Sequence, residues 1–176
     1  GDGSKAGPGM TAAEMVARAR SAVGKGIHYG LGQGGWHPED ALPTHSGSCD
    51  CSGFVAWCLG RDRHDSEMPG GWIETSAIVR DATLMQGEGL FDRMKWSEAQ
   101  PGDLVVYGDR YEPGTRKLIH QGHVGVVAAI GAAGPETVVH ASRGNERRTG
   151  DAIQETGVEL WEARGGIVAR FSASET

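Results

Sequence analysis

Apolar residues recur at helical spacing near the start of the chain, in the series Met15, Val16, Ala19 and Val23. Intervals of three and four residues place such side chains on one face of an α-helix. The segment Thr11-Ala-Ala-Glu14 comes just before this series, and a Thr followed three residues later by a Glu can cap a helix reciprocally. We therefore expect a helix that begins after Thr11 and ends at the glycines Gly24 and Gly26.

Two more helices are expected before residue 100. A short one begins near Cys51 and runs to Leu59, with Gly60 at its C-terminal end. Its apolar stripe consists of Phe54, Val55 and Cys58. Residues 27–47, which precede it, are rich in Gly, Pro and His and are expected to form an irregular loop. The third helix is expected over about residues 75–85.

After residue 100 the period of the pattern changes from helical to strand-like. Five strands are expected, at residues 103–107, 123–130, 136–141, 158–161 and 167–171. Helices followed by strands are typical of an α+β fold, in which the helices pack on one face of an antiparallel sheet. The long connections at residues 108–122 and 142–157 either wall a cleft or are disordered.

The composition is that of a globular domain, because 38% of the 176 residues are hydrophobic and 23% are charged. The formal net charge of −6 argues against nucleic acid as a partner, since nucleic acid requires a basic surface. No run approaches the ~20 apolar residues of a membrane-spanning helix, so no integral membrane segment is expected. We expect a single domain over residues 11–173. Residues 1–10 are interpreted as a flexible tail or cloning remnant, so either a leader was trimmed or Met10 is the natural start.

Three cysteines lie close together, at positions 49, 51 and 58. Cys51 stands at the expected start of a helix, where the helix dipole and free backbone N–H groups favour the thiolate. Cys51 is therefore the candidate nucleophile, with a buried structural cysteine as the alternative. Cys58 belongs to the apolar stripe of that helix and is expected to be structural.

Two histidines can complete a nucleophilic site. His123 begins an apolar strand and is the candidate general base, with an ordinary strand-edge histidine as the alternative. If strands 123–130 and 136–141 pair across a tight turn, paired residue numbers sum to 265, so that His140 faces Gly125. His140 then lies on the same sheet face as His123, because side chains alternate along a strand. Gly125 leaves room between the imidazoles, so we expect His140 to orient and polarise His123.

Four segments in this order resemble the NlpC-type cell-wall cysteine peptidases: Asp50-Cys-Ser-Gly-Phe-Val55, Pro101-Gly-Asp-Leu-Val105, Gly122-His-Val-Gly125 and Val139-His-Ala141. The resemblance extends loosely from about Thr11 to Phe171 and implies a papain-like core. Members of this family cut peptide bonds in bacterial peptidoglycan stems, commonly after γ-D-glutamate. The resemblance implies Cys51 as nucleophile, His123 as base and His140 as the third residue, with a thioester intermediate and neither a metal nor another cofactor.

The same resemblance implies roles for three neighbours of the nucleophile. Tyr29 matches the family's Tyr before a Gly-rich turn and would help to hold the oxyanion or a substrate carbonyl, unless it is only a surface anchor. Asp50 and Ser52 flank the nucleophile as in members that bind the free amine of a stem peptide. The chain departs from the family pattern at Trp72-Ile-Glu-Thr-Ser76, where Glu74 stands in place of an Arg that contacts the glutamate carboxylate.

Other functions fit these residues less fully. Cys49 and Cys51 together with His120 and His123 offer a set of zinc ligands, but that site leaves His140 without a role. An acyltransferase or transpeptidase on the same scaffold would pass the thioester to an amine. A non-catalytic wall-binding module would be expected to lack part of the triad.

For a hydrolase, the expected partners are peptidoglycan stem peptides. The location that follows is secreted, periplasmic or in the cell wall, with delivery by a secretion system or a phage as the alternative. If the protein is a toxin, we also expect an immunity or inhibitor protein as a partner.

Overall fold

The computed structural model describes residues 10–172, so the tail expected over residues 1–10 lies outside the described residues except for Met10, which packs against the core. Within that range the α-helices are α1 (Ala12–Ser21), α2 (Cys51–Cys58), α3 (Thr75–Leu84), α4 (Arg143–Thr149) and α5 (Glu159–Ala163). Two short 3₁₀ helices are η1 (Pro69–Gly71) and η2 (Trp96–Glu98). None of the helices in the described part of the chain is long and apolar enough to cross a membrane.

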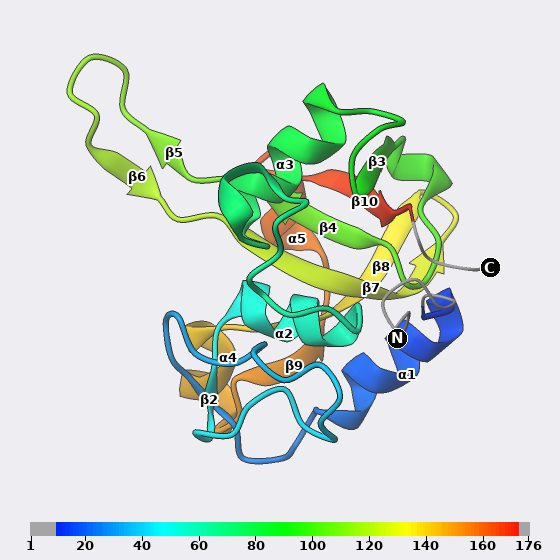
Figure 1. Ribbon diagram of the computed structural model, residues 1–176, viewed down its shortest axis with the longest axis vertical. Coiled ribbons are helices and arrows are strands. Elements are labelled where there is room, and N and C mark those ends of the chain that lie inside the picture. Colours follow the sequence, from blue (N-terminus) through cyan, green and yellow to red (C-terminus); the bar gives the residue numbers. More distant parts are fainter. Residues whose placement is uncertain (1–9, 173–176) are drawn as a thin grey trace.

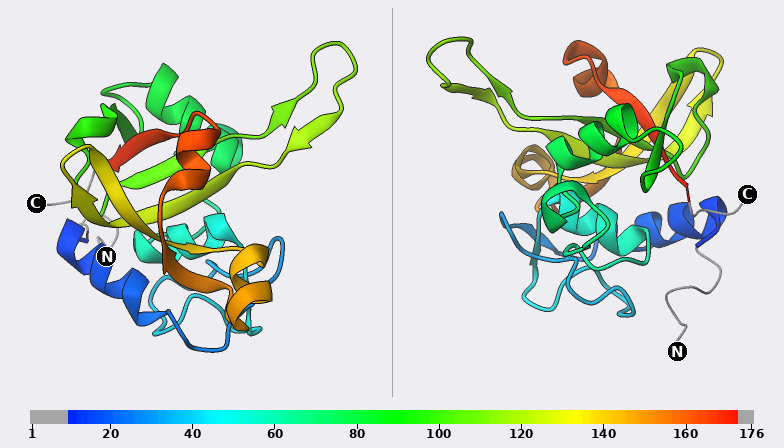
Figure 2. Two further views of the ribbon diagram at one scale, coloured as in Figure 1. Left: turned by 180° about the vertical axis from the view of Figure 1, so that it is seen from behind. Right: turned by 45° about the horizontal axis from the view of Figure 1, so that its top comes forward.

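Six strands form one antiparallel sheet in the order β3-β10-β4-β7-β8-β9. Their bounds are β3 (Phe91–Met94), β4 (Leu104–Tyr107), β7 (His123–Gly131), β8 (Gly134–Ala141), β9 (Ile153–Thr156) and β10 (Ile167–Phe171). Two small ladders pair β1 (His28–Tyr29) with β2 (Ser48–Cys49), and β5 (Arg110–Tyr111) with β6 (Leu118–His120). Helices α1 to α3 lie on one face of the large sheet, and α5 lies on the other (Figures 1 and 2). The expected α+β fold is confirmed.

Two apolar cores lie on the two faces of this sheet. Strand β4 shows the alternation, since Leu104 and Val106 belong to the larger core beneath α1, α2 and α3, whereas Val105 and Tyr107 belong to the smaller one. Trp161 of α5 is fully buried in the smaller core. The candidate histidines lie on the side of Trp161, whereas Cys51 belongs to the larger core.

The expected helices and most of the expected strands are present. Thr11 and Glu14 form the predicted capping box at the start of α1. The register of the β7–β8 hairpin is also as predicted, because Val126 pairs with Val139 and Val127 with Val138, apart from irregularities nearer the turn. A Cβ on Gly125 would lie 2.9 Å from the Cβ of His140, so that only glycine fits opposite this histidine.

Three expectations about the second half of the chain were wrong or incomplete. Residues 159–161 belong to helix α5, with Val158 as its N-cap, and do not form a strand, because this turn buries Trp161 against the sheet. The supposed loop 142–157 contains α4 and β9, the edge strand of the sheet. Residues 108–122 form a two-stranded arm, β5–β6, that projects from the body (Figure 1). Strand β3 was not anticipated at all.

Candidate active site

Cys51 is the first residue of α2, where the helix leaves backbone N–H groups unpaired. Asp50 is the N-cap and its carboxylate accepts a hydrogen bond of 2.8 Å from the N–H of Gly53. The backbone N–H groups of Cys51, Ser52 and Val124 act on the Cys51 sulfur and lower the pKa of its thiol. Val124 follows His123 directly, so the thiol lies against the beginning of β7.

Burial has the larger effect on the thiol. Cys51 is only 7% exposed, and burial, together with the smaller effect of the Asp50 carboxylate, raises the pKa of its thiol to about 12. The helix terminus therefore does not produce the resting thiolate that was expected, because desolvation opposes the charged form more strongly than the N–H groups stabilise it. The thiol of the candidate nucleophile is therefore neutral at rest.

The structure brings His123 and His140 together on one face of the β7–β8 hairpin. His123 Nε2 lies 2.7 Å from His140 Nδ1 in a buried hydrogen bond. The indole of Trp161 stacks on the His123 ring, with ring centroids 5.2 Å apart, and its Nε1 donates to the His123 carbonyl at 3.3 Å. Since Nε2 of His123 is occupied, Nδ1 is the ring nitrogen that remains for a reacting group.

The hydrogen-bond chain continues beyond His140 to strand β9. His140 Nε2 lies 2.8 Å from the hydroxyl of Thr156, and that hydroxyl donates to the carbonyl of Gly157 at 3.0 Å. The backbone of His140 is held as well, because buried Asn145 of α4 donates to its carbonyl at 3.0 Å. The imidazole of His140 is thus fixed at both ring nitrogens.

Both imidazoles are buried and favour their neutral form. Burial and, to a smaller extent, the nearby Arg164 guanidinium lower the pKa of His123 to about 4. The pKa of His140 lies well below its ordinary value, mainly because of burial and to a smaller extent because of His123 and Arg148. At neutral pH the three groups are therefore a thiol and two uncharged imidazoles, and His123 has a lone pair to accept a proton.

Asp50 lies where its role differs from the expected one. Its carboxylate is 3% exposed and forms two hydrogen bonds of 3.0 Å with the guanidinium of Arg63. It also accepts from the N–H of Gly32 at 2.7 Å, in addition to its cap of α2. A carboxylate whose oxygens are occupied by protein donors and excluded from solvent is not available to a substrate amine. Asp50 instead holds the helix that carries Cys51.

Tyr29 and Ser52 are both close to the thiol of Cys51. The phenol of Tyr29 is half-buried, and burial raises its pKa, with further increases from the neighbouring Cys51 and Asp50. The Arg143 guanidinium lies 5.0 Å above the Tyr29 ring. Ser52 is buried and contributes its backbone N–H beside the Cys51 sulfur. Tyr29 therefore presents a protonated hydroxyl near the thiol.

The residues of the alternative zinc site do not converge. Among residues 10–172, the structure brings three side chains with metal-ligand atoms together in one group. That group contains none of Cys49, Cys51, His120 or His123. The Cys49 thiol donates instead to a backbone carbonyl at 3.3 Å, and the ring of His120 packs edge-on against Tyr107.

Sequence reasoning missed the supporting residues Thr156 and Trp161, because both fell in segments assigned to the wrong element. The segment Ile153-Gln-Glu-Thr156 has a single apolar residue, so the local pattern gives little signal for strand β9. Pairing of His140 with Gln154 then places Thr156, two residues farther on, on the same sheet face as His140.

A pocket of about 520 Å³ is lined by residues that support both flanks of this site. Arg63 pairs with the residue before Cys51. Asp109 accepts a hydrogen bond of 2.7 Å from the N–H of the residue before His123. A second guanidinium, that of Arg80, lines the same pocket. The pocket therefore lies next to the segments that carry the thiol and the imidazole, and Arg80 is its cationic group that is not paired with Asp50.

Glu74, the departure from the family pattern, has a structural task. Its carboxylate accepts a hydrogen bond from the N–H of Ala77 and thereby caps α3. Glu74 lines the same pocket as Arg63 and Arg80. The region therefore contains arginines, although they come from other positions in the sequence.

Comparison with known proteins bears on the fold. No protein-family model and no curated protein sequence matches the chain. Among solved structures, it is similar to a crystal structure of a Staphylococcus aureus protein similar to lipoprotein, of the NLP/P60 family, with a TM-score of 0.52 and 17% identity. The match covers 94% of this chain and 42% of that one, so this chain spans less than half the length of its structural neighbour. The two proteins share a fold.

Proposed function

We propose that the chain is a cysteine peptidase or amidase that hydrolyses amide bonds in bacterial peptidoglycan stem peptides. The observation that carries the proposal is the buried hydrogen bond of 2.7 Å between His123 of β7 and His140 of β8. The start of β7 also contacts the beginning of α2 at Cys51. The shared fold with an NLP/P60 protein supports a cell-wall hydrolase.

In the proposed reaction the Cys51 sulfur attacks the amide carbonyl carbon while its proton passes to Nδ1 of His123. The C–N bond then breaks as His123 gives that proton to the leaving amine, and a thioester remains. Water attacks the thioester and transfers a proton to His123. The C–S bond breaks to release the acid, and His123 returns the proton to the sulfur.

Since the resting pair is neutral, proton transfer has to accompany the attack on the substrate. Because the thiol and the imidazole are both buried, charge separation is unfavourable until the substrate is bound and proton transfer accompanies the attack. The hydroxyl of Tyr29 is the proposed donor to the oxyanion, since its raised pKa keeps the O–H protonated.

Thr156 is proposed as a positioning residue that determines where the protons of the two imidazoles lie. Its hydroxyl donates to the Gly157 carbonyl, so it accepts the Nε2–H of His140. His140 Nδ1 is then unprotonated and accepts the Nε2–H of His123. By this assignment Nδ1 of His123 carries the lone pair that would accept the Cys51 proton in the proposed reaction.

The proposed substrate site is the pocket that contains Arg63 and Arg80. The guanidinium of Arg80 suits a carboxylate on the stem peptide, whereas that of Arg63 is buried and held by Asp50. Glu74 and Asp109 also line the pocket, but backbone N–H groups already bind both carboxylates. Asp50 remains in the proposal as a support for α2 and Ser52 as a neighbour of the nucleophile, without direct contact to a substrate amine.

Incubation with defined muropeptides followed by mass spectrometry tests the function. We expect loss of one amide bond with gain of one water by the wild type, and no product with Cys51→Ala. Cys58→Ala is the matched control, because Cys58 is a fully buried cysteine of the same helix. An added amine acceptor that appears in the product would identify an acyltransferase instead. Cleavage by Cys51→Ala at the wild-type rate would refute the mechanism.

A further inference from the structure

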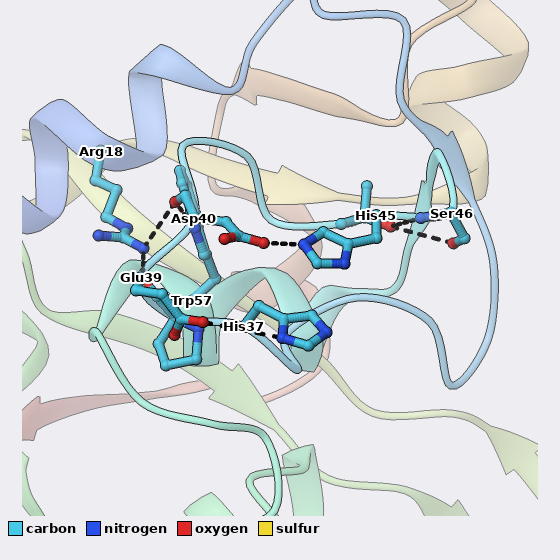
Figure 3. Close-up of polar contacts among 9 residues, drawn as sticks. Arg18, His37, Glu39, Asp40, His45, Ser46 and Trp57 are labelled. Atoms are coloured by element: carbon cyan, nitrogen blue, oxygen red, sulfur yellow. Dashed lines mark hydrogen bonds and ion pairs between the residues drawn. The ribbon is translucent and has the colours of Figure 1, made fainter.

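A second group of side chains with coordinating atoms lies in the irregular loop between β1 and β2. His37, Asp40 and His45 each offer one possible ligand atom, and these atoms all lie within 4.8 Å of one another. The two imidazole rings are stacked, with centroids 4.0 Å apart and planes 9° apart. His45 Nε2 forms a hydrogen bond with the carboxylate of Asp40 (Figure 3). None of the three belongs to the candidate active site.

The backbone that carries these ligands is held by the core helices. The carbonyl of Asp40 accepts a hydrogen bond of 2.9 Å from the indole Nε1 of Trp57, which is buried in α2. Arg18 of α1 donates to the same carbonyl at 3.3 Å and also to the Pro38 carbonyl, and its guanidinium lies 4.2 Å above the Trp57 ring (Figure 3). The loop is therefore held in place at Asp40 from two directions.

A local turn places two of the ligands on the same side of the loop. The N–H of Asp40 donates to the carbonyl of His37 at 3.1 Å, which closes the turn between them. His45 lies farther along the same loop, on the segment that leads to β2, and its imidazole lies beside these two side chains. With its ligands already close together, the loop loses little conformational freedom when an ion binds.

The ligand set indicates the kind of ion. Two imidazoles and one carboxylate suit zinc and similar divalent transition metals, whereas magnesium and calcium prefer oxygen ligands alone. All three side chains line a pocket of about 130 Å³, so a coordination position remains open to water or to a small ligand. The carboxylate of Glu39 lies 3.9 Å from Nδ1 of His37 and adds negative charge at the edge of the group.

We propose that His37, Asp40 and His45 bind one zinc-class divalent ion. The bound ion takes the place of the hydrogen bond between His45 and Asp40 and joins the two halves of the loop. The same loop supports the candidate nucleophile helix, because the N–H of Asp50 donates to the carbonyl of Gln33 at 3.0 Å. The site is thus a brace for that loop, and it stands whether or not the proposed peptidase activity is correct.

The test is a titration of the full chain, carrying no histidine tag, with zinc in excess magnesium by calorimetry. We expect binding of one ion per chain. His37→Ala, His45→Ala and Asp40→Asn should each weaken binding at least about tenfold, the scale known for loss of even a second-shell group. His28→Ala is the matched control, because His28 is another exposed histidine paired with a carboxylate, that of Glu146. Its affinity for zinc should equal that of the wild type.

Two further readouts separate this site from the thiol and from misfolding. Bound cobalt should show a visible spectrum without thiolate-to-cobalt charge transfer, and the spectrum should be unchanged in Cys51→Ala. Zinc should raise the Tm of the wild type and slow hydrogen exchange over residues 33–47, and it should do neither in His45→Ala, whose side chain is 61% exposed in the wild type. Absence of saturable zinc binding, or equal affinity in the wild type and the three ligand variants, would overturn the proposal.

Discussion

Replacement of Thr156 by Val tests the proton arrangement of the proposed site. Valine has nearly the shape of threonine but offers no acceptor to Nε2–H of His140, which the hydroxyl now receives at 2.8 Å. Without that acceptor, His140 can place its proton on Nδ1, where it would oppose the Nε2–H of His123. The predicted consequence is a base in the wrong tautomer for part of the time.

The size of the effect follows from the hydrogen bond that is lost. One intramolecular hydrogen bond contributes about 1 kcal/mol net, and about 1.4 kcal/mol corresponds to a tenfold change in rate. Because Thr156 is half-buried, water can replace the hydroxyl in part. We therefore expect kcat/KM to fall about three- to tenfold, mainly through kcat.

Initial rates with a defined stem peptide give kcat and KM, and nitrogen NMR of the labelled imidazoles reports the tautomers directly. Thr156→Ser should retain the rate and the tautomers because it retains the hydroxyl. Thr137→Val is the matched control, since this strand threonine also bonds through its hydroxyl, to Glu155 at 2.6 Å. If Thr156→Val and Thr137→Val have equal kcat/KM and the imidazole shifts do not change, the proton arrangement assigned to the two histidines is wrong.

Three other outcomes are expected. His140→Ala should lower kcat less than His123→Ala does, and His140→Asn should recover part of the loss; steady-state rates measure both. Equal rates for His140→Ala and the wild type would show that His140 has no part in the site. Asp50→Ala should destabilise the fold by about 3–5 kcal/mol in urea unfolding, because it leaves Arg63 buried without its partner. A change confined to KM would restore the substrate role for Asp50. For His123, whose pKa of about 4 is below the ordinary value, the unfolded chain binds more protons between pH 4 and 6.5. The free energy of unfolding should therefore rise with pH across this range, and it should rise less steeply in His123→Gln.

The sequence was informative wherever a feature depends on residues close together in the chain. The capping box at Thr11, the helix that begins at Cys51 and the β7–β8 register could all be predicted, because periodicity, caps and glycines act over a few residues. The proximity of His123 to His140 belongs here too, since a hairpin turns sequence spacing into spatial distance by a simple rule of alternation.

Prediction failed where a segment depends on distant partners. Trp161 lies in a short run that fits a strand, and burial against the sheet makes it part of a helix instead. The edge strand β9 has few apolar residues and was taken as loop, so Thr156 could not be placed beside His140. Weak local patterns of this kind are decided by what packs against them.

By itself, the sequence determined the α+β architecture, the candidate nucleophile and the candidate pair of histidines. Only the tertiary structure decided their environment: the burial that keeps Cys51 a neutral thiol, the engagement of Asp50 by Arg63, and the meeting of His37 with His45. The reason is physical. Charge state and hydrogen-bond partners depend on solvent exclusion and on groups far apart in the chain, and neither can be obtained from the order of neighbouring residues.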